Sequence, residues 1–415
     1  MYNIGLMNRR PLFSLAFWAA VLGLFAACGD SGDSRLITVS GANLAEKFQW
    51  LSYNAVGNTG YLIKVTAADE ELAPQNLSCS CSNITIRLKG IGNERVISLS
   101  GSGALFTINN GVTLILDNLT LAGASGNNNA LIQVNSGGSL QLNQGAIISG
   151  NNGGGVSNNG GTITMTGGEI SGNNGSGVRN DVTYTSIDRE YVTIYGTFTM
   201  TGGKISGNTA TASTGGGVHN NGIFTMNGGE ISGNSGGGVH NKGTFTMNSG
   251  KIYGNTSTSF DGGGVHNGVI YTMIDGVYLA VNGTFTMTGG EISGNISSPF
   301  DGGGVSNHGT FIMEDGSISG NTCSIGGGVD NHGTFTLKGG KISGNTALLY
   351  GGGVSNSVTY TYSYEGYVSH VIFTMSGGEI SGNTASSYGD GVFVGDGTVL
   401  DKTGGTITGD IELNN

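Results

Sequence analysis

Residues 236–255 read Gly-Gly-Gly-Val-His-Asn-Lys-Gly-Thr-Phe-Thr-Met-Asn-Ser-Gly-Lys-Ile-Tyr-Gly-Asn, and much of the chain repeats this phrase. Its ending, Ile-x-Gly-Asn, occurs nine times between Ile148 and Asn383, eight times as Ile-Ser-Gly-Asn. The shortest full cycle is 21 residues, from Asn234 to Asn255. A unit of this length cannot bury an apolar face alone, so the repetition predicts a solenoid of stacked copies.

Each copy contains three short strand-like pieces separated by Gly and Asn. In residues 236–255, Val239 begins the first piece, Phe245 and Met247 alternate in the second, and Ile252 lies in the third. Phe245 and Met247 share a face because residues two apart in a strand point to the same side. Copies stacked ~4.8 Å apart as parallel strands would form Val, Phe, Met and Ile ladders in the core. Asparagines at the bends would form ladders of their own.

An outward-facing position supports this stacking. The residue before Ile-x-Gly-Asn alternates in charge along most of the chain: Glu169, Lys204, Glu230, Lys251, Glu291, Ser317, Lys341, Glu379. Opposite charges on neighbouring copies favour a parallel ladder, although each exposed pair contributes only ~0–1 kcal/mol. We therefore expect these pairs to fix the register more than the stability.

The repeats resemble those of two known groups. Three strands per turn with asparagine ladders resembles the right-handed parallel β-helix of the pectate-lyase type. Ile-Ser-Gly-Asn-Thr-Ala (205–210, 342–347, 380–385), followed by Gly-Gly-Gly-Val, is similar to repeats of chlamydial-type polymorphic outer-membrane proteins. That family has Phe and Ile where this chain has Ile and Val, and its members are surface-displayed adhesins. The resemblance covers residues 100–410 and implies an all-β, right-handed parallel β-helix, with about a dozen turns over ~55–60 Å.

The N-terminal 27 residues resemble a lipoprotein signal peptide, with Arg9 and Arg10 before an apolar run that ends at Ala27. Cys28 follows in the position that is lipidated in bacterial lipoproteins. The alternatives are an ordinary signal peptide or a membrane anchor. Residues 28–34 would be a tether, and we expect an extracytoplasmic protein anchored by lipid at the outer membrane or cell surface.

The remaining chain divides into a cap and a repeat region. Residues 35–110 read as an N-terminal cap and degenerate turns, with strand-like runs such as 61–65 and 84–88. Asn43-Leu44-Ala45-Glu46 is a capping box that predicts a short helix from Leu44 to about Asn54, covering the first turn. Residues 111–415 carry the repeats.

Composition excludes one class of partner. The net charge is −11, with only 16 Lys and Arg and no basic run, so nucleic acid is not an expected partner. Gly accounts for 81 residues, but Pro for only 3, and the glycines recur in a fixed frame that indicates order.

Three connections are long enough for hairpins. Residues 181–195, 268–282 and 357–371 each read strand, turn, strand, at intervals of three turns. Insertions at one register of a solenoid project from one face, and here successive arms would lie ~14 Å apart. The arms hold nine of the fifteen tyrosines, which are candidates for binding or for packing the arms onto the solenoid: Tyr184, Tyr191, Tyr195, Tyr271, Tyr278, Tyr360, Tyr362, Tyr364, Tyr367.

Two sets of residues are candidate reactive sites. Asp261 and Asp301 precede Gly-Gly-Gly on adjacent turns and could share a cation, but no Lys or Arg accompanies them as catalysis requires. His219, His240 and His266 share one position on three consecutive turns, and a solvated polar ladder is a simpler interpretation than a metal site. We expect neither a metal nor a cofactor.

The cysteines offer no metal spacing. Cys79 and Cys81 would point to one face of a strand, either as buried thiols or as a local bridge, and Cys323 has no evident partner.

The sequence therefore favours a non-catalytic, adhesin-like lipoprotein that binds carbohydrate or protein through Tyr-rich arms. The alternatives are a polysaccharide lyase or hydrolase and a passive structural or antigenic coat.

Overall fold

A computed structural model describes residues 33–414 except 80, 82, 188–189, 211–214, 259–261, 275–276 and 359–370. Within this set it gives only the backbone of residues 34, 187, 190, 191, 271–274 and 277–280. Residues 1–36 and 37–415 form two separate units. In the first, Asp33–Arg35 forms a single turn of 3-10 helix, η1. All features below belong to the second unit.

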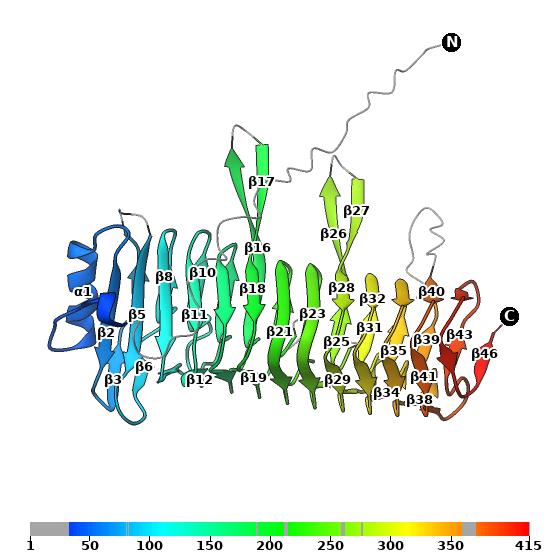
Figure 1. The fold of residues 1–415 in the computed structure, drawn as a ribbon. Helices are drawn as coiled ribbons and strands as arrows, with labels where there is room; N and C mark the ends of the chain where they lie inside the picture. Colours follow the sequence, from blue (N-terminus) through cyan, green and yellow to red (C-terminus); the bar gives the residue numbers. More distant parts are fainter. Residues whose placement is uncertain are drawn as a thin grey trace, which may run out of the picture. The chain divides into compact units, whose positions relative to one another are not determined.

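Residues 37–414 form a parallel β-helix (Figure 1), which confirms the predicted fold class. Each turn, called a rung, contributes one strand to each of three columns, named here by their buried residues: the Val, Phe–Met and Ile columns. The strands of the Val column, in chain order, are β4 (Gln75–Leu77), β7 (Phe106–Ile108), β10 (Ile132–Asn135), β13 (Val156–Asn159), β16 (Val178–Ile187), β20 (Val218–Asn220), β22 (Val239–Asn241), β25 (Val265–Asn267), β31 (Val305–Asn307), β35 (Val329–Asn331), β39 (Val354–Asn356), β43 (Val392–Val394) and β46 (Ile411–Leu413).

The Phe–Met column begins closest to the N-terminus. Its strands are β1 (Ile37–Thr38), β2 (Gly60–Val65), β5 (Ile84–Gly90), β8 (Val112–Asp117), β11 (Ser139–Leu142), β14 (Thr162–Met165), β18 (Thr197–Met200), β21 (Ile223–Ser232), β23 (Thr244–Tyr253), β28 (Thr284–Met287), β32 (Thr310–Met313), β36 (Thr334–Leu337), β40 (Ile372–Met375) and β44 (Val399–Lys402). Strands β21 and β23 run on into the Ile column without a break.

The Ile column completes each rung. Its other strands are β3 (Asp69–Leu72), β6 (Val96–Leu99), β9 (Leu119–Ala122), β12 (Ala146–Ser149), β15 (Glu169–Ser171), β19 (Lys204–Ser206), β29 (Glu291–Ser293), β33 (Ser317–Ser319), β37 (Lys341–Ser343), β41 (Glu379–Ser381) and β45 (Thr406–Ile407). A small sheet joins the loops that lead back to the Val column, through β24 (Thr256–Ser257), β30 (Ile296–Ser297), β34 (Thr322–Ile325), β38 (Thr346–Tyr350) and β42 (Thr384–Ala385).

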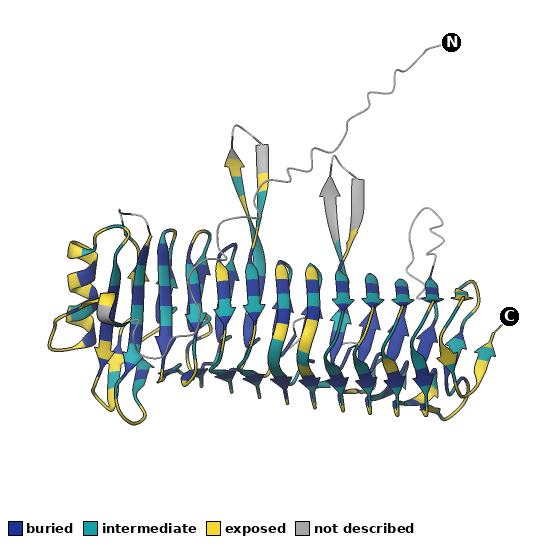
Figure 2. Ribbon diagram, in the orientation of Figure 1, coloured by how far each residue is buried: buried dark blue, intermediate teal, exposed yellow. Residues whose placement is uncertain are grey.

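The core consists of the four apolar ladders that the sequence predicts. Identical residues pair across neighbouring rungs, as Phe224 does with Phe245 and Met226 with Met247. From Phe198 to Phe373 the phenyl rings stack in parallel with centroids 4.7 or 4.8 Å apart. Figure 2 shows buried residues (dark blue) on the strands along most of the solenoid, and exposed or intermediate residues on the last strands, β44 to β46. Burying each such side chain is worth ~1.5–3 kcal/mol, so the ladders are the main source of stability.

Two buried asparagine ladders run beside the apolar ones. The Asn of Val-x-Asn donates from Nδ2 to Oδ1 of the next rung, at 2.7 or 2.8 Å from Asn158 to Asn356. The Asn of Ile-x-Gly-Asn forms a second ladder, from Asn173 to Asn383, at 2.9–3.1 Å. These bonds satisfy polar groups that burial would otherwise leave unpaired.

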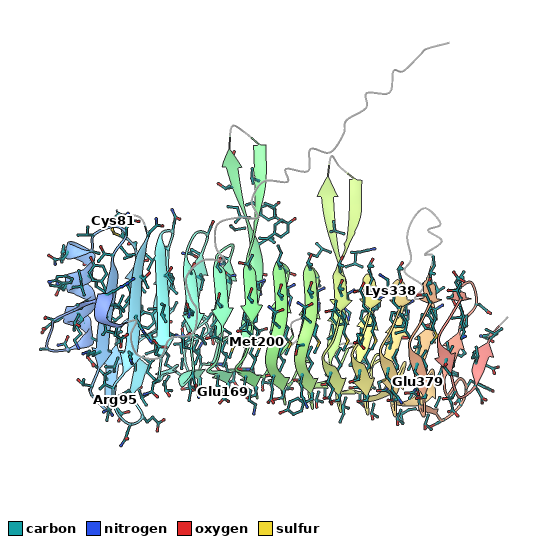
Figure 3. All side chains as sticks on the ribbon, in the orientation of Figure 1. Cys81, Arg95, Glu169, Met200, Lys338 and Glu379 are labelled. Carbon is teal, nitrogen blue, oxygen red and sulfur yellow. A yellow bond between two sulfur atoms is a disulfide. The ribbon has the colours of Figure 1, made fainter. Side chains whose placement is uncertain are left out.

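The predicted charge ladder lies on the outer surface of the Ile column. Cα pairing runs in register from Glu169 through Lys204 and Glu230 to Lys251. Further along, Lys251 lies 3.2 Å from Glu291, and Lys341 lies 3.0 Å from Glu379. A hydrogen bond from Ser293, together with Lys251, lowers the pKa of the Glu291 carboxyl. Figure 3 places Glu169 and Glu379 on one side of the solenoid.

A helix covers the first rungs, as predicted. Helix α1 spans Leu44–Asn54, and its Leu44, Phe48 and Leu51 are buried against the solenoid. The Asn43 side chain accepts from the Glu46 amide at 2.9 Å, and the Glu46 carboxylate accepts from the Ala42 amide at 2.9 Å. The capping box thus closes one residue earlier than in its usual form.

The runs expected as degenerate rungs form regular strands. Residues 61–65 lie in β2, where all but Lys64 are buried, and residues 84–88 lie in β5, where buried and less buried positions alternate. In the loop between β4 and β5, Cys79 and Cys81 form a disulfide. The sequence left that pairing open. Cys323 is a free, buried thiol.

Candidate functional site

Two of the three long connections form β-hairpins that project from the same side of the solenoid (Figure 1). In the first, called arm 1, β16 continues beyond its core residues and pairs antiparallel with β17 (Glu190–Tyr195). In arm 2, β26 (Val269–Ile274) pairs with β27 (Val277–Asn282). Both arms leave the solenoid where the Val column ends, because the residues after Val-x-Asn no longer point into the core. Most of the third connection, 357–371, lies outside the described residues.

Arm 1 presents tyrosines to solvent. Tyr184 is 65% exposed and Tyr195 is 54% exposed, and Val192, which lies further from the solenoid than both, is also exposed. Tyr191 lies on β17, and Tyr271 and Tyr278 lie on β26 and β27, where only the backbone is described. The other sequence candidates, Tyr360, Tyr362, Tyr364, Tyr367 and the lipidation residue Cys28, lie outside the described residues.

A polar groove of about 490 Å³ lies on the outer face of the Val column beside arm 1. Its floor includes Gln133, Ser157 and Arg179 from three successive strands, and its wall includes a stack of loop asparagines: Asn128, Asn152 and Asn174. These asparagines are joined through their side chains at 2.6 and 3.1 Å. Arg179 lies on β16, the strand that continues into arm 1, and it pairs with Asp181. No sequence motif had marked this groove.

Beyond Arg179, five imidazole rings form one continuous row on the same face. The rings of His219, His240, His266, His308 and His332 follow one another with centroids 5.2, 4.6, 5.3 and 4.8 Å apart. The sequence identified the first three. His308 and His332 lie two residues further along their rungs, in Val-x-Asn-His, and reach the same row because residues two apart share a face of a strand.

The first two rings of the row are not part of the solvated ladder that the sequence favours, whereas His266, His308 and His332 are partly exposed. His219 and His240 are each only 5% exposed. Glycine-rich loops cross the outer face of the Val column and cover it: a Cβ on Gly215 would lie 2.7 Å from the His240 backbone nitrogen. Further along, a Cβ on Gly326 would lie 2.5 Å from the Asp330 Cβ, and Asp330 is fully buried. Only residues without a side chain allow so close an approach.

Polar contacts tie the row to its surroundings at both ends. At one end, Asn221 Nδ2 lies 3.1 Å from His219 Nε2 and 2.6 Å from Asp181 Oδ1. At the other end, His332 Nε2 lies 2.6 Å from Asp330 Oδ2, and His332 Nδ1 lies 2.7 Å from the Ser357 carbonyl oxygen. Asp330 is thus a carboxylate that orients a ring, a feature that the sequence had not predicted.

Burial keeps the rings of His219 and His240 neutral. Burial, with Arg179 nearby, lowers the pKa of His219 to about 4. Burial, with His266 and His219 nearby, lowers the pKa of His240 well below its usual range. A neutral imidazole stacks on its neighbour without charge repulsion, so His219 and His240 are stable as an uncharged pair at neutral pH. His332 differs, because its two ring nitrogens face only acceptors and can both donate hydrogen bonds only when the ring is protonated.

The other reactive candidates are not brought together by the described residues. Asp301 is half-buried in the loop before β31, and Asp261 lies outside the described residues. Within the described ranges no group of three His, Cys, Asp or Glu side chains could hold a metal ion. Burial raises the pKa of the Cys323 thiol, which disfavours its reactive thiolate. Among the described helices, none combines the length and apolar character needed to span a bilayer.

The fold and the geometry of the arms, groove and histidine row are thus the basis for assigning a function. Comparison with models of protein families, with curated proteins and with solved structures found no match to this chain.

Proposed function

We propose that this chain is a non-catalytic, lipid-anchored surface protein that binds carbohydrate through arm 1 and the adjoining groove. The observation that carries the proposal is the exposure of Tyr184 and Tyr195 on a strand pair whose first strand also places Arg179 in the groove. Large exposed aromatic side chains on a projecting element are typical of contact surfaces rather than of packing.

The groove supports a sugar more than a hydrophobic ligand. Its side chains are chiefly amides and hydroxyls, which both donate and accept hydrogen bonds, as sugar hydroxyls do. The Arg179 guanidinium pairs through Nε with Asp181, and its other N–H groups can donate to the carboxylate of an acidic sugar. Tyrosine rings offer a flat apolar face with a polar tip, which complements the two faces of a pyranose ring.

The surface location rests on the N-terminal residues and on the repeats. The apolar run before Cys28 supports export and lipidation, and the resemblance of the repeats to surface-displayed adhesins supports exposure to the outside. The proposed partners are therefore the membrane, through the lipid, and a carbohydrate or a cell-surface protein that carries one.

A binding screen tests this function. The soluble chain from Gly29 onward would be applied to a glycan panel and to extracellular-matrix proteins, beside three variants: Tyr184→Ser/Tyr195→Ser, Arg179→Gln and Tyr53→Ser. Tyr53 is the matched control, because it is 80% exposed but lies on α1, at the far end of the solenoid from the arms.

We expect saturable glycan binding that the double Tyr variant loses by at least about tenfold, which corresponds to ~1.4 kcal/mol. The Arg179→Gln variant should lose affinity for acidic glycans, and Tyr53→Ser should bind as the parent does. Binding that survives the double variant would contradict the role of arm 1. Binding to proteins that carry no glycan would show that the ligand is protein and not carbohydrate. If the parent bound nothing, both the carbohydrate and the protein ligand would be rejected.

A further inference from the structure

The histidine row passes the roots of all three long connections. At arm 1, Asn221 bridges His219 to Asp181, the residue before the hairpin begins. At arm 2, a Cβ on Gly268 would lie only 2.8 Å from His266 Nε2, so this ring lies against the residue that precedes Val269.

At the third connection, His332 contacts the carbonyl of Ser357, its first residue. The row meets all three roots because it is continuous and because the connections recur every three rungs. A change at His219, His266 or His332 therefore acts next to a residue at the root of a connection.

The charged groups that face the row come from several elements. Arg179 and Asp181 belong to β16, Lys242 follows β22, and Asp330 belongs to β35. Arg179 and Lys242 place positive charge beside His219 and His240, whereas the carboxylates of Asp181 and Asp330 lie at the two ends. Protons added to the middle of the row thus meet other positive charges, in a position that water scarcely reaches.

We propose that the part of the histidine row from His219 to His266 is an acid-sensitive latch: its neutral rings hold the roots of arms 1 and 2 and the covering loops in place, and protonation releases them. Protonated neighbours ~5 Å apart in a buried site repel strongly, and the least costly relief is to lift the loops and arm roots so that water reaches the rings. The inner faces of the same strands carry Val and Asn, which do not titrate. The solenoid itself therefore stays folded while its outer face opens.

The direction of the pH effect follows from the depressed pKa values. In the open form the imidazoles regain an ordinary pKa near 6.5, whereas burial holds His219 at about 4 in the closed form. The open form consequently binds more protons in this interval, and the balance moves toward it as the pH falls from about 6.5 toward 4. Above that interval both forms are neutral and the latch is closed.

Hydrogen exchange tests the latch without any ligand. Amide protection would be measured by mass spectrometry at about pH 7.5 and about pH 5, corrected for the intrinsic pH dependence of exchange. The segments of interest are β16–β17 and β26–β27, and β8, β11 and β14 serve as an internal reference. The variant His240→Gln/His266→Gln removes two chargeable rings from the middle of the row, and His370→Gln, which alters the sixth histidine, is the control.

We expect the arm segments of the parent and of the control to lose protection at least about tenfold more than the reference strands on acidification. The double variant should lose less than about threefold. Equal loss in arms and reference would indicate global unfolding and overturn the latch, as would an unchanged parent or a double variant that behaves as the parent does.

A second measurement covers the case in which the double variant does not fold. Imidazole proton resonances of the parent would be followed by NMR through the same pH range. A His219 or His240 ring that titrates near pH 6.5, while arm protection stays unchanged, would overturn the proposal. The latch rests on the proposed function only because it treats the arms as a binding surface. If no glycan bound at any pH but the exchange difference remained, the proposed function would be rejected and the latch would stand.

Discussion

The Nδ2 atom of Asn241 lies 2.8 Å from Oδ1 of Asn267, and this bond is one link in an amide chain buried along the whole repeat region. Asn241 Oδ1 in turn accepts from Asn220 at 2.7 Å, and its Nδ2 also lies 3.1 Å from the Thr284 carbonyl oxygen. The apolar ladders accept any apolar side chain that fills the space. The amide ladder, in contrast, requires a hydrogen-bond donor and an acceptor at every rung.

Breaking that chain should be expensive. Asn241→Leu would leave the buried Asn267 Oδ1 without its donor, whereas Asn220 Nδ2 would keep the Gly222 and Thr244 carbonyl oxygens at 3.2 and 3.0 Å. We expect a loss of ~1–3 kcal/mol in the free energy of unfolding, measured with urea. The control is Asn248→Leu, because the Asn248 side chain bonds to Asn227 at an exposed position. Equal losses in the two variants would refute the claim.

The phenyl stack should respond to truncation. Phe245 is fully buried, with the rings of Phe224 and Phe285 4.7 Å away on either side. We expect Phe245→Ala to cost ~3–5 kcal/mol of unfolding free energy, because a cavity opens between two rings held apart by the backbone spacing. Thr246→Ala, on the outward face, should change stability by less than ~0.5 kcal/mol in the same denaturation experiment. A cost below ~1 kcal/mol for Phe245→Ala would show that the stack can collapse.

Two glycines of one rung should differ in their tolerance of a side chain. A Cβ on Gly243 would lie 2.2 Å from the Gly222 carbonyl oxygen, a backbone atom that cannot move aside. Gly254 has a φ of +61° but nothing within 4 Å of a Cβ. We expect Gly254→Ala to cost ~1–2 kcal/mol of backbone strain and Gly243→Ala clearly more. Thermal unfolding of both variants gives the order, and the reverse order would contradict the close packing of neighbouring rungs.

The pH dependence of stability should depend on His219. Its pKa is lowered to about 4 in the folded protein, against 6.5 in an unfolded chain. The stability that the neutral ring contributes is therefore present above pH 6.5 and is lost as the pH falls toward 4, by ~3 kcal/mol in total. Chemical denaturation of the parent and of His219→Gln at several pH values checks this, because carboxylate contributions common to both cancel. A difference between the two proteins that stays constant with pH would argue against the depressed pKa.

The outer charge ladder should matter little. Lys251 pairs with Glu291 at 3.2 Å and stands in register with Glu230 on the other side. Lys251→Glu would place three carboxylates in a row, and we expect a loss of ~0–1 kcal/mol at low ionic strength that largely disappears in 1 M salt. Lys251→Gln, which removes the attraction without adding repulsion, is the matched control. A loss that salt does not reduce would mean that the side chain acts by packing.

The fold follows from the sequence because its determinants are local and repeated. The spacing of Phe245 and Met247 indicates that both point inward. Because this pattern recurs from rung to rung, the register can be predicted without knowing which distant residues are in contact. The cap was also predictable, since Asn43 and Glu46 mark a helix start by short-range chemistry. In a protein with ladders of identical residues, the tertiary contacts can therefore be predicted from the period of the sequence.

The site depends on features that periodicity does not carry. His308 and His332 escaped notice because they occupy a different position in the repeat from His240, although all three reach one row. The burial of His240 comes from loops whose path across the Val column the sequence does not specify. The groove floor at Gln133 and Arg179 arises from residues that differ from rung to rung, and no repeat pattern marks such positions.

The three-rung interval between the roots of the long connections has an evolutionary consequence. Because each rung contacts mainly its neighbours, recombination that inserts or removes one unit of about 88 residues would keep every ladder in register. Such an event would add or delete one arm, together with its share of the histidine row. Valency, and with it avidity for a repeating ligand, could then change in a single genetic step at no cost to folding.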